Sequence, residues 1–306
     1  MKIINTVSMT YEEWLHKRKE SIGASESGAI LGLNPWRSAM DVYFDKVGET
    51  EPIEDNLNMR LGRDLEPIIK KLFEEETELT VRNDNKIRID EQHSFITTNL
   101  DGMVVGKKVP IEYKTMGKWD GEISDTYYAQ IQHQMMVTNT PYIYFVALVL
   151  GFNKNLIIEK YDRDDDFIAE MRHELVNFWH GNVLTKTPPD AKSYDDVSKL
   201  FKKSREGSHK PADIHIMDCC SYLNELIVRK KNIEKTIKEE KKGIMSYMGE
   251  YETIEFQGIP IATWKKTKDS LKFDNNSFKN DHPELYKEYL INRDGYRRFN
   301  LKNTEK

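Results

Sequence analysis

Apolar residues recur at two different spacings along the chain before residue 190. Helical spacing, together with N-cap residues, predicts helices over residues 10–21, 28–33, 38–48, 58–78, 123–138 and 164–180. Short runs rich in β-branched residues predict strands over residues 79–82, 86–90, 95–98, 142–150 and 156–161. The run 142–150 is apolar throughout, which is typical of a buried central strand. Pro67 predicts a kink or a break near Glu66 in the fourth helix.

A β-hairpin is predicted between two of these segments. Two short apolar runs, at residues 102–105 and 109–113, are separated by the turn-like triplet Gly106-Lys107-Lys108. The pattern therefore combines strands and helices, and it indicates an α/β fold with a mixed central sheet flanked by helices.

The hairpin carries three charged residues whose chemistry is related. Asp101 stands at the start of the first strand, and Glu112 and Lys114 lie on one face of the second strand. Two carboxylates are suited to a hard divalent cation such as Mg²⁺, and a lysine beside them can position a water or neutralise charge on a phosphate. The pattern therefore indicates metal-assisted phosphodiester hydrolysis. A solvated strand face with a weak ion pair between Glu112 and Lys114 is the alternative.

The chain changes character after Pro188 and Pro189, so we predict one domain over residues 1–189 and an α+β extension over residues 190–306. Residues 213–249 have a helical pattern rich in Lys and Glu, which fits one solvated helix or a two-helix hairpin. Strands are expected at 251–256 and 259–265. Aromatic and basic residues alternate at 296–301; contact with nucleic acid would explain them, but we favour a strand that completes a small sheet.

Composition narrows the class of protein. The chain has 306 residues, of which 38% are hydrophobic and 32% charged, as in an ordinary globular protein. No apolar run approaches the roughly 20 residues of a membrane span, and no signal peptide is evident at the start. The adjacent Cys219 and Cys220 fit neither a disulfide framework nor a zinc site, so a cytoplasmic protein is expected. A net charge of −5 excludes a uniformly basic DNA-binding protein but not an enzyme with a local DNA groove.

Other polar residues are candidates for binding or catalysis. Ser25 and Ser27 lie in a small-residue loop before a helix, where they and the upstream Arg18 could bind a phosphate, although Ser25 could equally cap the helix. Glu66 has apolar neighbours and could face a cleft or solvent. Gln130 lies one helical turn from Gln134; their amides could bind phosphates or orient a water, or simply cover the surface.

Several separated motifs share one family pattern. After Arg18 they are IGAS at 22–25, ILGLNPW at 30–36, GRDLEP at 62–67, NLDG at 99–102, IEYKT at 111–115 and YAQIQHQM at 128–135. In this order, between residue 11 and about residue 189, they resemble the YqaJ-type viral recombinases, which are similar to the lambda-type phage alkaline exonucleases of the PD-(D/E)xK nuclease class. The chain departs from the class name at Leu100, where the name has a proline. No functional motif of the C-terminal third can be assigned in this way.

The resemblance implies a lambda-exonuclease-like fold and a 5′-to-3′ exonuclease. Such an enzyme would degrade one strand of linear double-stranded DNA and leave 3′ single-stranded overhangs for phage-type recombination by single-strand annealing. It implies two Mg²⁺ ions, which Mn²⁺ could replace, and a phage single-strand annealing protein as partner. Many members form a ring-shaped homotrimer. No membrane partner is expected, and the location would be the host cytoplasm for a phage or prophage protein.

The resemblance also implies roles for particular residues. Asp101 and Glu112 would hold Mg²⁺ with the backbone carbonyl of Tyr113, and Lys114 would activate or orient the attacking water. The remaining assignments are Glu66 at the second metal, Gln130 in the catalytic network or at the nearby phosphate, and Arg18, Ser25, Ser27 and Asn99 at the 5′-phosphate of the digested strand.

Two other functions remain open from the sequence. A restriction-like endonuclease would use the same fold and metals but cut internally. A non-catalytic DNA-end-binding protein would keep the fold alone, and the presence of Asp101, Glu112 and Lys114 together argues against it. Residues 190–306 could dock a partner or form a lid over the DNA.

Overall fold

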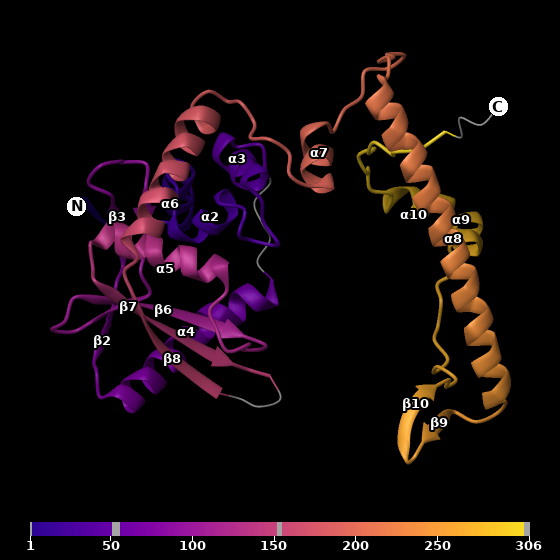
Figure 1. Cartoon of the computed structure of the whole chain (residues 1–306), viewed down its shortest axis with the longest axis horizontal. Helices are drawn as coiled ribbons and strands as arrows, with labels where there is room; N and C mark the ends of the chain where they lie inside the picture. Colours follow the sequence, from indigo (N-terminus) through magenta and orange to yellow (C-terminus); the bar gives the residue numbers. More distant parts are fainter. Residues whose placement is uncertain (1, 51–55, 152–154, 303–306) are drawn as a thin grey trace. The chain divides into compact units, whose positions relative to one another are not determined.

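The computed structural model describes residues 2–50, 56–151 and 155–302, and the chain divides into two compact units. The first unit ends at Leu200 and the second begins at Phe201, somewhat later than the boundary expected after residue 189. Figure 1 shows the elements of each unit, which are described separately below.

A mixed five-stranded sheet forms the centre of the first unit, in the order β2-β5-β6-β7-β8. Strands β6 and β7 are parallel, and the other neighbouring pairs are antiparallel. The predicted α/β class with a mixed sheet is therefore confirmed. The strands are β2 (Val81–Asn83), β5 (Gly102–Val104), β6 (Val109–Met116), β7 (Tyr142–Val149) and β8 (Asn155–Asp162).

Helices cover both faces of this sheet (Figure 1). On one face, Ile69 and Phe73 of α4 (Leu57–Thr77) pack in a cluster with Ile111 of β6. On the other face, α5 (Asp125–Thr138) packs in a cluster with Phe145 of β7. Because strand side chains alternate between faces, Glu112 of β6 points to the α5 face.

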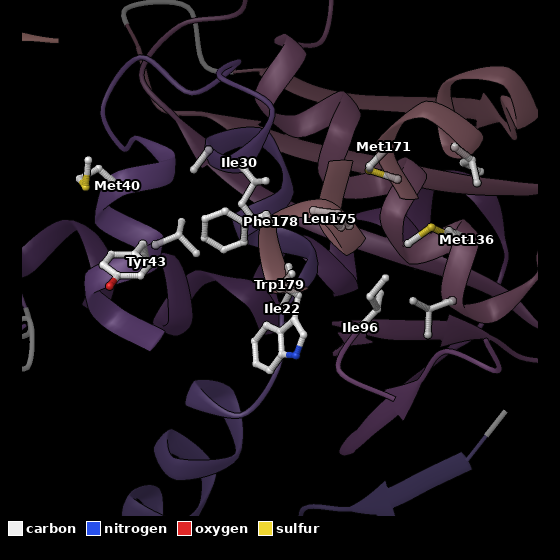
Figure 2. Packing of buried hydrophobic residues seen from close by; sticks show 14 of the residues in the cluster. Ile22, Ile30, Met40, Tyr43, Ile96, Met136, Met171, Leu175, Phe178 and Trp179 are labelled. Carbon is white, nitrogen blue, oxygen red and sulfur yellow. The ribbon is translucent and has the colours of Figure 1, made fainter. Parts of the chain in front are cut away.

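A second core joins the remaining helices of the first unit, and Figure 2 shows its buried side chains. It includes Ile22, Met40, Leu175 and Trp179, and the rings of Phe95 and Trp179 stack at 5.1 Å between centroids. The helices are α2 (Ala24–Ile30), α3 (Ala39–Val47), α6 (Asp165–Phe178) and a π-helical turn, η1 (Trp179–Val183).

The other elements of this unit are short. Helix α1 (Tyr11–Lys19) begins with the capping box of Thr10 and Glu13, in which each side chain accepts a hydrogen bond from the other residue's backbone N–H. A small antiparallel sheet has the order β1-β3-β4. Its strands are β1 (Lys2–Asn5), β3 (Lys86–Ile89) and β4 (Thr97–Thr98), and α7 (Tyr194–Leu200) ends the unit.

Two helices differ from the sequence prediction. Helix α2 begins at Ala24 rather than at residue 28, because the Glu26 side chain accepts a hydrogen bond from the Gly23 N–H and closes the first turn there. Gly23, not Ser25, is therefore the N-cap. Helix α4 continues through Pro67, so of the predicted kink or break the break is absent, and the apolar contacts of Ile69 and Phe73 hold the turns that follow.

The second unit contains one long helix and several short elements. Helix α8 (Ile214–Met248) is a single helix rather than a hairpin, and Gly249 ends it. The two predicted strands are present as β9 (Thr253–Phe256) and β10 (Ile259–Thr263), followed by α9 (Asn275–Asp281) and α10 (Pro283–Glu288).

The strand expected at 296–301 is not present, so that prediction is wrong. Tyr296 and Phe299 remain largely exposed, and no buried face holds this segment against the β9–β10 hairpin. Arg297 instead donates a hydrogen bond to the carbonyl of Phe201.

Within the described residues, no helix has the length and apolar character that a membrane span requires.

Helices α2 and α5 lie in close contact. A Cβ at Gly28 would lie 3.1 Å from the Thr126 Cα, so a larger residue would push the two helices apart by a few tenths of an ångström. Nearby, the buried His133 imidazole bonds to the Thr97 carbonyl through Nε2 (2.9 Å) and to the Ser27 hydroxyl through Nδ1 (2.6 Å). A neutral ring satisfies both partners, with Nε2–H donating and Nδ1 accepting.

This contact predicts a loss of stability in acid. Burial lowers the pKa of His133 to about 4, so between pH about 6.5 and 4 the unfolded chain binds one more proton there than the folded chain. As the pH is lowered through this window, this residue should therefore reduce the free energy of unfolding by roughly 3 kcal/mol. Unfolding midpoints of the native chain and His133→Gln, measured from pH 7 to pH 4, should show a shallower decline in the variant. His173→Gln, which removes an exposed histidine, is the control; equal slopes for native chain and His133→Gln would contradict the assignment.

Candidate active site

The β5–β6 hairpin places the two central carboxylates side by side. Gly106 and Lys108 have positive φ angles of 80° and 54°, which let the chain reverse between the strands. Asp101 directly precedes β5, and its Oδ2 accepts a hydrogen bond from the Tyr113 N–H at 2.7 Å. This bond ties Asp101 to the backbone beside Glu112.

The carboxylate of Glu112 is surrounded by donors from two elements. Its side chain is buried, with the residue only 3% exposed. The Lys114 ammonium and the Gln130 amide both donate to Oε1, the latter at 2.6 Å, and the Gln134 amide donates to Oε2 at 2.5 Å. Because Gln130 and Gln134 lie one turn apart on α5, the helix holds the carboxylate in one orientation.

Burial and mutual repulsion both disfavour the charged forms of the acidic side chains. Burial, and next the charge of Glu112, raise the pKa of Asp101 well above its ordinary value. Burial and Glu112 also raise the pKa of Glu66, which places this α4 residue within electrostatic reach of the hairpin. Burial lowers the pKa of Lys114, but Glu112 and Asp101 outweigh that effect and raise it overall, so this lysine is protonated. A further cation would relieve the repulsion.

The chemistry of these groups fits a hard divalent cation. The half-buried Asp101 and the buried Glu112 supply carboxylate oxygens at one end of the hairpin, and Mg²⁺ prefers oxygen ligands and keeps some of its waters. In the part of the chain that the structure describes, no group of three or more His, Cys, Asp or Glu side chains is arranged to hold a metal. The oxygens of Glu112 are instead bonded to Lys114, Gln130 and Gln134.

The predicted phosphate ligands lie in different environments. Arg18 lies in the last turn of α1 with its guanidinium 4.8 Å from the Trp14 ring centroid, and Ser25 is exposed on the first turn of α2. Asn99 is exposed and donates to the Lys86 carbonyl. Ser27 is fully buried and bonded to His133, so it has no surface for a phosphate and is withdrawn as a candidate.

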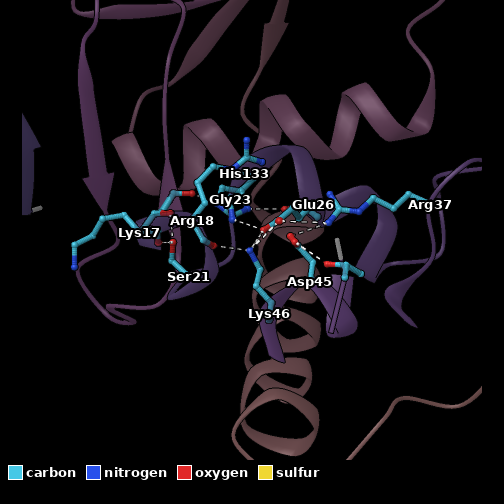
Figure 3. A network of polar contacts seen from close by, with 12 residues as sticks. Lys17, Arg18, Ser21, Gly23, Glu26, Arg37, Asp45, Lys46 and His133 are labelled. Atoms are coloured by element: carbon cyan, nitrogen blue, oxygen red, sulfur yellow. Dashed lines mark hydrogen bonds and ion pairs between the residues drawn. The ribbon is translucent and has the colours of Figure 1, made fainter. Parts of the chain in front are cut away.

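A buried ion pair connects α1, α2 and α3, as Figure 3 shows. The Lys46 ammonium lies 2.7 Å from a Glu26 carboxylate oxygen and donates to the Arg18 carbonyl at 2.7 Å. The same carboxylate accepts from the Gly23 N–H. The pair therefore fixes the turn that joins Arg18 to Ser25, although burial lowers the pKa of Lys46.

The sequence analysis missed this pair and did not predict the bond from Gln134 to Glu112. A lysine on the apolar side of α3 was the sequence signal for the buried ion pair. The one-turn spacing between Gln130 and Gln134 was the signal that both amides could reach the same carboxylate.

Breaking the buried pair should destabilise the first unit. Lys46→Met would leave the buried Glu26 with only the Arg37 guanidinium, 3.7 Å away, as a counter-charge, which should cost up to about 3–5 kcal/mol. The double variant Glu26→Gln with Lys46→Met should recover much of that loss, because no unpaired charge remains. Urea denaturation of the four chains tests this. Equal stability of Lys46→Met and the native chain would show that the pair does not hold the turn.

Comparisons with known proteins extend the sequence resemblance. Residues 13–141 match the model of the YqaJ-like viral recombinase domain. The uncharacterized protein YqaJ of Bacillus subtilis (strain 168) is 29% identical over 317 aligned residues, which cover 97% of this chain and 95% of that protein. The uncharacterized protein R354 of Acanthamoeba polyphaga mimivirus is 24% identical and covers 63% of this chain and 38% of that protein.

A solved structure shows the same fold. LHK-Exo, an alkaline exonuclease from Laribacter hongkongensis, in its complex with dAMP superposes with a TM-score of 0.50 and 23% identity. The match covers 57% of this chain and 94% of that one. The resemblance carried by the motifs is confirmed: residues 13–141 match the YqaJ-like viral recombinase domain, and the chain has the fold of the lambda-exonuclease-like nucleases.

Proposed function

We propose that this chain is a Mg²⁺-dependent deoxyribonuclease that digests linear double-stranded DNA from the 5′ end and leaves 3′ single-stranded overhangs. The observation that carries the proposal is the cluster of Asp101, Glu112 and Lys114, in which the Tyr113 N–H holds the first carboxylate and the Lys114 ammonium contacts the second. The nuclease fold and the YqaJ-like domain support the choice of DNA as the substrate. A phage single-strand annealing partner and a homotrimeric ring, both expected from the resemblance, stay predictions.

The proposed metal ligands are Asp101, Glu112 and the backbone carbonyl of Tyr113. Glu66 would act at a second ion through a water. When bound, the ions would supply Lewis-acid stabilisation of the charge that develops on the phosphate and would lower the pKa of a bound water.

Lys114 and Gln130 would act on the water and the phosphate. Because the pKa of Lys114 is raised, its ammonium carries a proton that it can donate in a hydrogen bond. It is therefore suited to orient the water and to stabilise negative charge, rather than to remove a proton. Gln130, already bonded to Glu112, would hold the network or reach the nearby phosphate oxygen.

The terminal phosphate of the digested strand would bind Arg18 and Ser25, with Asn99 and Gln130 nearer the carboxylates. The guanidinium of Arg18 can make charge-assisted hydrogen bonds to phosphate oxygens, and the exposed hydroxyl of Ser25 can add another. Ser27 takes no part.

Digestion of a 5′-labelled or 3′-labelled linear duplex tests the activity. The duplex carries either a 5′-phosphate or a 5′-hydroxyl, and the reactions contain Mg²⁺ or EDTA beside a closed circular control. We expect Mg²⁺-dependent loss of the 5′-phosphorylated strand with the circle intact. A cut circle would favour the restriction-like endonuclease, and tight end binding with no cleavage would favour the non-catalytic DNA-end-binding protein.

Lys114→Ala should abolish cleavage while DNA binding is retained. Losing a positioned charged donor at the developing charge should slow hydrolysis by about 100-fold or more. Initial rates on the linear duplex, and fluorescence anisotropy of a labelled duplex, separate the two effects. The control is Lys118→Ala, which removes an exposed lysine just beyond the same strand. Unchanged cleavage by Lys114→Ala would count strongly against the proposed site.

A further inference from the structure

Helix α8 carries a stripe of exposed apolar side chains along one side. Leu226, Ile233, Ile237 and Ile244 are between 40% and 59% exposed. With Lys230 and Glu240 they follow the alternating spacing of three and four residues that places side chains at the a and d positions of a coiled coil. From Leu226 to Ile244 the stripe is about 27 Å long. Exposed apolar side chains at this spacing, with two charged positions between them, indicate an interface.

The two charged positions in the stripe identify its partner. When two copies of α8 lie antiparallel, each a position faces a d position of the other helix. With the two-fold axis beside residue 235, Ile233 lies opposite Ile237 of the partner subunit, and Leu226 lies opposite Ile244 of the partner subunit. In the same register Lys230 lies opposite Glu240 of the partner subunit. The apolar layers and the charged layers of the helix are therefore both self-complementary.

A parallel pair of α8 helices would not bring the opposite charges of the stripe together. There Lys230 would face Lys230 of the partner subunit and Glu240 would face Glu240 of the partner subunit, so like charges would meet at the centre of the interface. A parallel pair would gain contacts between Arg229 and Glu234 at the rim. The antiparallel pair instead places the two copies of Glu234 near each other at the rim, where Lys230 of the same helix lies 3.9 Å away. Charges at the centre are screened less than charges at the rim, so the antiparallel arrangement is favoured.

We propose that α8 is a self-association surface, and that two copies of this chain pair through it as an antiparallel coiled coil. The interface is isologous, as two-fold symmetry requires. The proposal does not depend on the nuclease activity, because none of its residues belongs to the first unit. Its closing experiment therefore measures assembly alone.

The test is a charge-reversal cycle on the full chain, with mass measured by sedimentation velocity over a range of concentrations. The native chain should form particles with an even number of chains. Glu240→Lys should place Lys opposite Lys in both symmetric layers, halve the particle mass and weaken association by about tenfold or more. Lys230→Glu should weaken association in the same way. The double variant, Lys230→Glu with Glu240→Lys, should restore association to near the native level.

The control is Glu239→Lys, which makes the same charge change one residue away, where Glu239 faces out of the stripe and contacts Lys242. It should leave association unchanged, and circular dichroism should show the same helix content in all variants. A native chain that stays monomeric at the highest concentration measured would overturn the proposal. A single variant without effect, or a double variant without recovery, would overturn the antiparallel register.

Discussion

Two carboxylates held close together at one hairpin are the constraint on which the rest of the first unit depends. Asp101 and Glu112 lie at the entrance to one hairpin, and neither is free to turn to solvent: the Tyr113 N–H holds the first, and three side chains hold the second. Burying charge in this way is costly without a counter-charge. Lys114 supplies a counter-charge to Glu112, but burial and then the charge of Glu112 still raise the pKa of Asp101. A bound cation would favour the charged form of both carboxylates.

The rest of the unit can be understood as the support of this arrangement. Gly102 has no Cβ, and one there would lie 2.6 Å from the Val81 side chain, so β2 and β5 can approach beside Asp101. Helix α5 is fixed to α2 through Gly28 and His133, and it brings Gln130 and Gln134 to the carboxylate. The buried pair of Glu26 and Lys46 fixes the turn before Ser25. Sites on rigid elements keep such positions more precisely than sites on mobile loops.

Much of this was predictable from local patterns, and the rest was not. The hairpin, the buried strand at β7 and the capping box at Thr10 follow from signals within a few residues of each other. The partners of Glu112 come from a helix far along the chain, so no local pattern assigns them. Ser27 was expected to lie in a polar loop. Because α2 begins earlier than predicted, its side chain is buried in the core instead. The segment 296–301 has a strand-like sequence pattern but forms no strand, because its aromatic side chains do not pack against a partner and stay exposed.

The most direct measurement of the central claim is the affinity for Mg²⁺, by calorimetry without DNA, of the native chain and of Glu112→Gln. The substitution keeps the shape of the side chain and removes its charge, and circular dichroism confirms that the variant folds. If the buried carboxylates form a metal site, the native chain binds Mg²⁺ and the variant binds it at least about tenfold more weakly. Equal affinities, or no binding by the native chain, would contradict the account.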